Sequence, residues 1–246
     1  MFCKLVSFNR FEALRAVSVI LAASFLFCAT AVFFCRIPYE SEETLVYTDA
    51  RERVVILDAG HGGEDGGTVG VNGVYEKDLN LSVSNILAAM LRSAGVTVIE
   101  TRTEDRLLYR EEENIRGYRK MYDLRNRLAV AQNNPDALFV SLHMNSFSSP
   151  QYKGLQVYYA DTAGSERLAR VIQNGIRTTL QPDNDREVKA AGSGIYLLDR
   201  AENTAVLIEC GFLSNPEECE KLSSEDYRKQ LCFSLFCGII TYIDET

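Results

Sequence analysis

The sequence contains no internal repeat, no low-complexity tract and no cluster of lysine and arginine. The first two absences exclude solenoid proteins and disordered scaffolds. The net charge of −8 also argues against a nucleic-acid partner, which would require a basic face. With 246 residues, of which 46% are hydrophobic and 24% charged, the chain is long enough for one globular domain of ordinary composition.

Two kinds of binding motif are also missing. No pair of cysteines has the CxxC spacing of a thiolate metal site, and a domain of this size needs no disulfide bonds. We expect Cys232 and Cys237 to be small core residues of an apolar helix. The glycine-rich segment near residue 60 matches neither GxGxxG nor a P-loop, so a nucleotide site is not expected.

The N-terminus carries a separate signal. An uncharged, mostly apolar run covers residues 16–35, which is about the length that a bilayer-spanning helix needs. Basic residues are more frequent before the run than after it, which predicts export of the rest of the chain. Ala29-Thr30-Ala31 resembles a signal-peptidase site, so secretion after cleavage is the alternative. Because apolar residues continue past that site, we expect an uncleaved membrane anchor in residues 1–36, a linker in 37–52 and an extracytoplasmic domain in 53–246.

The rest of the chain alternates strand-like and helix-like patterns. Helices are expected from Asp78 to Gly95, through Leu124 to Asn134, from Ser165, and from Ser224. The expected strands cover residues 53–58, 96–101, 137–143, 154–160, 194–198 and 205–209. Apolar strands separated by helices predict a three-layer α/β domain whose mostly parallel, twisted sheet is flanked by helices.

The chain has only two histidines, and both follow or end a predicted strand. His61 lies in Asp58-Ala59-Gly60-His61-Gly62-Gly63, and His143 ends the strand of residues 137–143. Because ligands bind at the carboxyl ends of the strands in open α/β sheets, both imidazoles should face one crevice. Glu76, before the first helix, and Glu209, at a strand end, can join them. Two imidazoles and one carboxylate make a catalytic zinc site, and a second carboxylate can take a proton from water.

Each of these residues also has a structural interpretation. A histidine is often a hydrogen-bonded structural residue, Glu76 could favour a helix N-terminus, and Glu209 could pair with an arginine. Asp58 and Asp65 are weaker candidates, because short acidic residues beside glycines usually shape turns. Cys210 should point away from Glu209, because side chains alternate along a strand.

Five segments of the sequence occur in an order that resembles a known family. They are Leu57-Asp58-Ala59-Gly60-His61-Gly62-Gly63, Glu76-Lys77-Asp78-Leu79-Asn80-Leu81, Thr101-Arg102-Thr103-Glu104-Asp105, Ser141-Leu142-His143-Met144-Asn145, and Leu207-Ile208-Glu209-Cys210-Gly211-Phe212-Leu213-Ser214-Asn215-Pro216. The chain is similar in this respect to the zinc-dependent N-acetylmuramoyl-L-alanine amidases of the Amidase_3 type, over residues 53–243. The resemblance implies that His61, Glu76 and His143 are zinc ligands and that Glu209 is the catalytic carboxylate.

Within that family the chain is most similar to the germination-specific, spore-cortex amidases. The segments Arg116-Gly117-Tyr118-Arg119 and Gly194-Ile195-Tyr196-Leu197-Leu198 carry this closer likeness. It implies cleavage of the amide between N-acetylmuramic acid and L-alanine in cortex peptidoglycan, before muramic-lactam formation, in the spore envelope. The resemblance also allows for an exported accessory protein. Because no third histidine exists, Asn145 is a candidate substrate or oxyanion contact. The alternatives are another cell-wall zinc peptidase and a catalytically silent wall-binding regulator.

Overall fold

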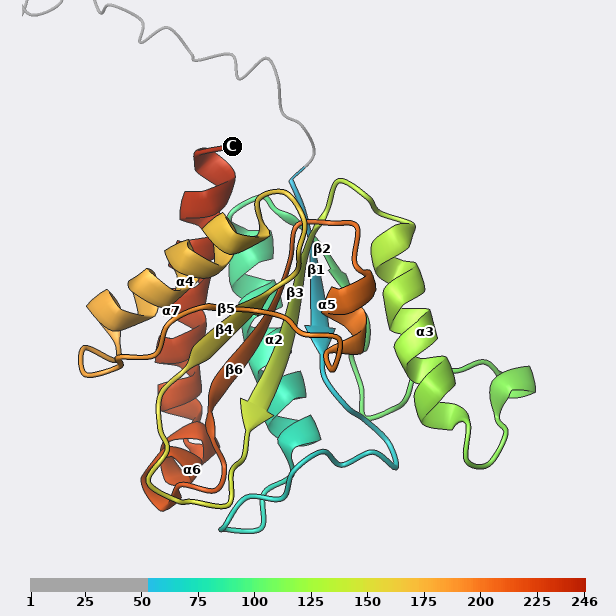
Figure 1. The fold of residues 1–246 in the computed structure, drawn as a ribbon, viewed down its shortest axis with the longest axis horizontal. Coiled ribbons are helices and arrows are strands. Elements are labelled where there is room, and N and C mark those ends of the chain that lie inside the picture. The colour runs from blue at the N-terminus through green and yellow to red at the C-terminus, as the bar shows by residue number, and fades with distance from the viewer. Residues whose placement is uncertain (1–52) are drawn as a thin grey trace, which may run out of the picture. The chain divides into compact units, whose positions relative to one another are not determined.

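The computed structural model describes residues 53–246, in which helices cover both faces of a six-stranded sheet (Figure 1). The strands are β1 (Val54–Ala59), β2 (Thr97–Glu100), β3 (Leu138–Asn145), β4 (Gln156–Tyr159), β5 (Lys189–Ala190) and β6 (Ala205–Phe212). The helices are α2 (Glu76–Ser93), α3 (Arg119–Gln132), α4 (Ser165–Thr179), α5 (Tyr196–Arg200), α6 (Pro216–Ser223) and α7 (Glu225–Asp244), with a 3-10 turn at Glu111–Glu113. The anchor and linker predicted in residues 1–52 lie outside the described residues.

The sheet has the strand order β2-β1-β3-β6-β4-β5. The first four strands of this order are parallel to one another, whereas β4 is antiparallel to β6. The prediction of a mostly parallel sheet in a three-layer α/β domain is therefore confirmed. Since β1, β3 and β6 are parallel neighbours, their carboxyl ends meet at the same edge of the sheet.

Two apolar layers hold the sheet between the helices. The alternation of side chains sends Val55 and Leu57 of β1 toward α2, α4 and α7, whereas Ile56 packs with Leu128 of α3 and Leu197 of α5. The same alternation in β3 and β6 places His143 and Glu209 on the α3 side of the sheet, near its carboxyl edge. The layer that covers this side is smaller, since α5 has only five residues.

Several element boundaries differ from the sequence-based prediction. The segment 194–198 was predicted as a strand, but its residues 196–198 form the start of α5, in which Leu197 and Leu198 are buried. The apolar run was too short for its periodicity to separate a strand from a buried helix. Helix α2 begins at Glu76, two residues before the predicted cap at Asp78. Glu76 thus belongs to the first turn of the helix and not to the loop before it.

The C-terminal helix α7 supplies part of the larger core. Cys232 is buried there, as predicted, and Cys237 is half-buried. Within residues 53–246, none of the helices combines the length and apolar character that a membrane span requires.

Candidate metal centre and catalytic cleft

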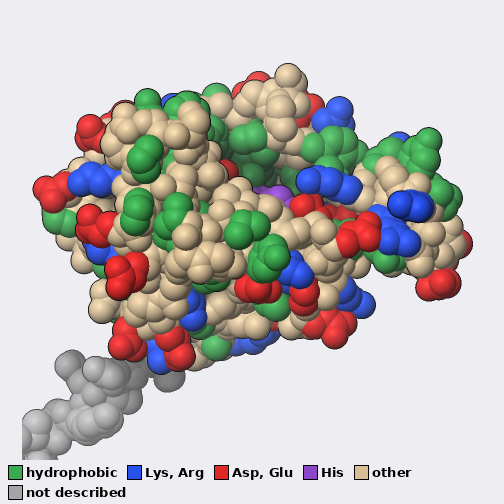
Figure 2. Space-filling model, turned by 90° about the horizontal axis from the view of Figure 1, so that it is seen from below, with side chains coloured by type: hydrophobic (Ala, Val, Ile, Leu, Met, Phe, Trp, Pro, Cys, Tyr) green, Lys and Arg blue, Asp and Glu red, His purple; other side chains and the backbone are tan. Residues whose placement is uncertain are grey.

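The two histidines and the two glutamates singled out by the sequence meet in one open cleft at the carboxyl edge of the sheet. His61 follows β1, His143 and Glu209 are paired in register on β3 and β6, and Glu76 begins α2. The cleft has a volume of about 390 Å³ and is lined by all four residues. In Figure 2 the histidine surface is visible at the bottom of this hollow.

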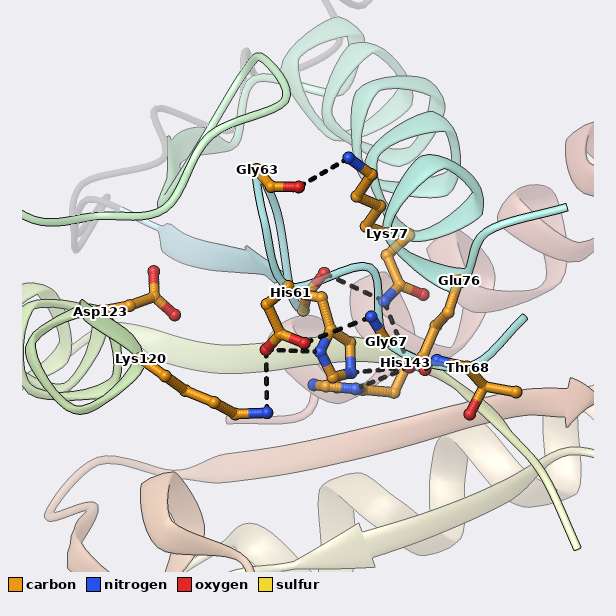
Figure 3. A network of polar contacts seen from close by, with 12 residues as sticks. His61, Gly63, Gly67, Thr68, Glu76, Lys77, Lys120, Asp123 and His143 are labelled. Carbon is orange, nitrogen blue, oxygen red and sulfur yellow. Dashed lines mark hydrogen bonds and ion pairs between the residues drawn. The ribbon is translucent and has the colours of Figure 1, made fainter. Parts of the chain in front are cut away.

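His61, Glu76 and His143 form a group that could hold a metal ion. One donor atom of each residue lies within 4.8 Å of the donor atoms of the other two. Glu76 Oε1 is 3.0 Å from His143 Nδ1 and 3.2 Å from His61 Nε2, so both ring nitrogens face one carboxylate oxygen (Figure 3). Two imidazoles and one carboxylate are the donor set of many catalytic zinc sites.

The Glu76 carboxylate is held firmly in this position. Its Oε2 accepts a hydrogen bond from Thr68 N at 2.8 Å, and its Oε1 accepts one from Met144 N at 3.1 Å. The side chain is buried, which by itself would raise its pKa. The hydrogen bonds and charges of His143 and His61 outweigh this effect, and they hold the pKa of the Glu76 carboxyl well below its usual range. Glu76 is therefore a carboxylate at every physiological pH.

The loop that carries His61 requires glycine at two positions, Gly60 before His61 and Gly67 after it, because both lie close to the proposed metal ligands. A Cβ atom at Gly60 would lie 2.2 Å from the His143 ring, and one at Gly67 would lie 2.5 Å from Glu76 Oε2. His61 itself has φ of 61°, the left-handed region that non-glycine residues rarely adopt. The backbone here is thus shaped so that the imidazole reaches the other two donors.

Two buried arginines hold this loop by its carbonyl groups. Arg127 of α3 donates to Ala59 O and His61 O, each at 2.7 Å, and forms a 2.7 Å ion pair with Asp58. Arg102 donates to Ala59 O at 2.9 Å and Gly60 O at 3.0 Å. No pattern in the sequence predicted a role for Arg127. Arg102 lies in the segment 101–105, which resembles the amidase family, and this resemblance was the only indication of a functional role for it.

The structure gives the two weaker candidates different roles. Asp58 is fully buried beneath the site, where it pairs with Arg127 and does not line the cleft. Asp65 lines the cleft, and its Oδ2 lies 3.0 Å from His61 Nδ1. Burial lowers the pKa of His61, but the contacts with Glu76 and Asp65 outweigh burial and raise that pKa overall. The prediction that Asp65 only shapes a turn was incomplete.

Glu209 differs from Glu76 and Asp65, the other acids of the cleft, in having a buried oxygen without a partner. Its Oε2 is buried and has no hydrogen-bond partner among residues 53–246. Burial raises the pKa of the Glu209 carboxyl to about 6; the nearby imidazoles oppose this shift, and the charge of Glu76 adds to it. The pairing with an arginine that the sequence left open does not occur within residues 53–246. A carboxyl group with a pKa near neutrality suits proton transfer.

The remaining candidates lie where strand alternation places them. Asn145, at the end of β3, lines the cleft, and its Oδ1 accepts a hydrogen bond from Ser146 N at 2.7 Å. Cys210 points into the core on the opposite side of the sheet from Glu209.

Comparisons with known proteins identify the family to which the chain belongs. Residues 55–241 match the family model of N-acetylmuramoyl-L-alanine amidases. The germination-specific N-acetylmuramoyl-L-alanine amidase of Bacillus subtilis is 37% identical over 196 residues, which cover 78% of this chain and 81% of the relative.

Among solved structures, the CwlD amidase from Clostridioides difficile in complex with the GerS lipoprotein superposes with a TM-score of 0.75 at 38% identity, covering 79% of this chain and 100% of that one. The amidase AmiC2 of Nostoc punctiforme gives a TM-score of 0.68 at 29% identity, covering 78% of this chain and 98% of that one. The chain therefore belongs to the Amidase_3 family of N-acetylmuramoyl-L-alanine amidases.

Proposed function

We propose that the amidase hydrolyses the bond between N-acetylmuramic acid and L-alanine with a zinc ion held by His61, Glu76 and His143, and with Glu209 as general base and acid. The observation that carries this proposal is the unpartnered Oε2 of Glu209 beside the His–Glu–His group in a single cleft. A buried carboxylate oxygen without a partner is costly to the fold, which favours a functional reason for it.

The donor set fits zinc. Nitrogen and carboxylate oxygen donors in a group of three are typical of catalytic zinc sites, which keep a further position open. The open cleft beside the three side chains leaves room for a water molecule and a substrate. When bound, zinc would polarise the scissile carbonyl and lower the pKa of a water molecule.

Glu209 and Asn145 are proposed to carry out the remaining steps, which are proton transfer and contact with the substrate. Glu209 takes the proton from the attacking water and delivers it to the departing amine of L-alanine. Asn145, on the cleft wall, is proposed to contact the substrate or the developing oxyanion through its amide NH₂ group, since its Oδ1 is occupied by Ser146 N.

The reaction is tested by identifying its products. Peptidoglycan fragments treated with the purified protein should yield muramic acid without peptide and peptides with free L-alanine amino termini in mass spectrometry. Cleavage within the stem peptide would identify a different cell-wall peptidase. A protein that binds fragments and releases nothing would be a silent regulator.

We further propose a role in the spore cortex, outside the cytoplasm. The similarity to the germination-specific amidase of Bacillus subtilis supports this role. The related Clostridioides difficile amidase forms a complex with a lipoprotein, which supports an exported accessory protein as a partner here. Deletion of the gene should remove muramic lactam from the muropeptide profile of spores, and lactam at normal abundance would contradict this role.

The proposed anchor in residues 16–35 is tested separately. A reporter fused after residue 52 should be extracytoplasmic and sediment with membranes. A soluble reporter with a new N-terminus near Val32 would indicate a cleaved signal peptide instead.

A further inference from the structure

Asp65 connects the imidazole of His61 to an exposed lysine. Its Oδ2 lies 3.0 Å from His61 Nδ1 and 2.9 Å from Lys120 Nζ. Lys120 belongs to the first turn of α3, and Figure 3 shows its side chain extending toward His61. One carboxylate oxygen therefore faces both a proposed metal ligand and a cation at the cleft wall.

The turn around Asp65 does not depend on this oxygen. Gly62 N donates to Asp65 O at 2.9 Å, and Asp65 N donates to Gly62 O at 3.0 Å, so backbone groups close the turn. The side chain adds a 3.3 Å hydrogen bond from Gly67 N to Oδ1. Oδ2 is thus left for His61 and Lys120, and a role in the turn does not explain its position.

His61 has more need of such a partner than His143. The backbone of His143 is fixed by strand pairing on β3, where Glu209 is its register partner. His61 lies in a loop with φ of 61°, so its ring orientation depends on side-chain contacts. A neutral imidazole donates from one nitrogen and offers a lone pair at the other.

We propose that Asp65 is a positioning residue for His61 and that Lys120 holds Asp65 in place. Donation from His61 Nδ1–H to Asp65 leaves the Nε2 lone pair facing Glu76 Oε1, where the proposed zinc would bind. Carboxylate partners of this kind orient ligating histidines and increase their basicity. The inference rests on the proposed zinc site and extends it to two residues that do not contact the metal.

Lys120 is suited to this supporting role. Its side chain is 64% exposed, whereas that of Asp65 is 18% exposed, so the lysine covers the outer side of the carboxylate. It is the one lysine or arginine among the residues that line the cleft, whose other charged members are Asp65, Glu76 and Glu209. Removal of Lys120 would leave Asp65 able to contact His61 but would also allow it to turn toward solvent part of the time, which weakens the contact.

The test measures zinc dissociation constants by competition with a chromophoric chelator. Asp65→Asn retains the shape and an oxygen that can accept from Gly67 N, but it places an NH₂ group toward His61. Asp65→Ala removes both contacts. We expect zinc binding to weaken about 10- to 100-fold in both variants, as for other partners of ligating histidines, with a smaller loss in Lys120→Met. Lys221→Met is the matched control, because Lys221 is half exposed and pairs with Glu217 at 2.6 Å on α6.

Wild-type zinc affinity in Asp65→Asn would overturn the proposal, since a role in the turn alone predicts that result. Thermal unfolding of the metal-free proteins checks that the variants fold. If Asp65→Ala does not fold, the zinc affinity of Asp65→Asn alone decides the test. Unchanged zinc affinity with a raised KM in Lys120→Met would make Lys120 a substrate contact and overturn its supporting role. Failure of the unsubstituted protein to bind zinc would overturn the zinc site itself, and this result is seen before any variant is made.

Discussion

His143 and Glu209 are register partners on the adjacent parallel strands β3 and β6. A proposed metal ligand and the proposed general base are therefore held next to each other by the hydrogen bonds of the central sheet. Both side chains lie on the same side of this strand pair, at the edge where the cleft opens. This metal ligand and the base are thus positioned by paired strands and not by loops, which favours precise proton transfer.

Substitution of either histidine should remove the metal. We expect His61→Ala and His143→Ala to lose most bound zinc and nearly all hydrolysis, because two remaining ligands do not form a catalytic site. Metal analysis of the purified variants measures this loss. Stoichiometric zinc with full activity in either variant would show that the ligand set is different.

The glycine before His61 should be indispensable to the metal site. A methyl group at Gly60 would lie 2.2 Å from the His143 ring, so Gly60→Ala should displace that ring and weaken zinc binding. Gly192→Ala is the matched control, because a Cβ there meets no atom within 4 Å. Zinc titration of both variants should separate them, and equal affinity would contradict the close packing of this loop.

The buried ion pair beneath the loop should be important for stability. Arg127→Met leaves Asp58 charged and unpaired in the core, which should lower the free energy of unfolding by about 3–5 kcal/mol. Arg170→Met, which removes an exposed pair with Glu166, should cost no more than about 1 kcal/mol. Denaturant unfolding of both variants measures the difference, and a similar small loss in both would contradict the role of the buried pair.

The same pair predicts the direction of a pH effect on folding. Burial raises the pKa of Asp58, but Arg127 and Ser141 outweigh it, so the folded-state pKa lies below the ordinary value of 3.8. A lowered folded-state pKa stabilises the fold above pH 3.8, and this contribution is lost as the pH falls below that value. The loss should be absent in Asp58→Asn. An identical acid-unfolding curve for Asp58→Asn would show that other groups cause acid unfolding.

Much of the site could be predicted because parallel strands end at one edge. His61 follows β1, and His143 and Glu209 lie two and three residues before the ends of β3 and β6, so the predicted strand positions alone brought them together. The roles of Asp65 and Arg127 could not be read in this way. An aspartate between glycines is typical of a turn, which Asp65 Oδ1 does support, and the contacts of Arg127 with residues 58–61 depend on how α3 packs on the sheet.

The secondary structure was predictable where patterns were long. The helix over residues 165–179 has a regular apolar periodicity, and its expected start at Ser165 is confirmed. The run at residues 195–198 is apolar but short, and residues 196–198 begin helix α5, in which Leu197 and Leu198 pack against the sheet. The secondary structure of such short segments is determined by tertiary packing and not by their sequence pattern.

In the proposed function, Glu209 performs the proton transfer while His61, Glu76 and His143 hold the metal. The most direct test is the activity per bound zinc of Glu209→Gln, which keeps the shape of the side chain but cannot accept a proton. We predict full zinc occupancy and a rate lower by about a hundred- to ten-thousand-fold, as is usual when a general acid–base group is removed. Loss of the metal with unchanged activity per remaining zinc would contradict the account, because Glu209 would then be a ligand and another residue the base.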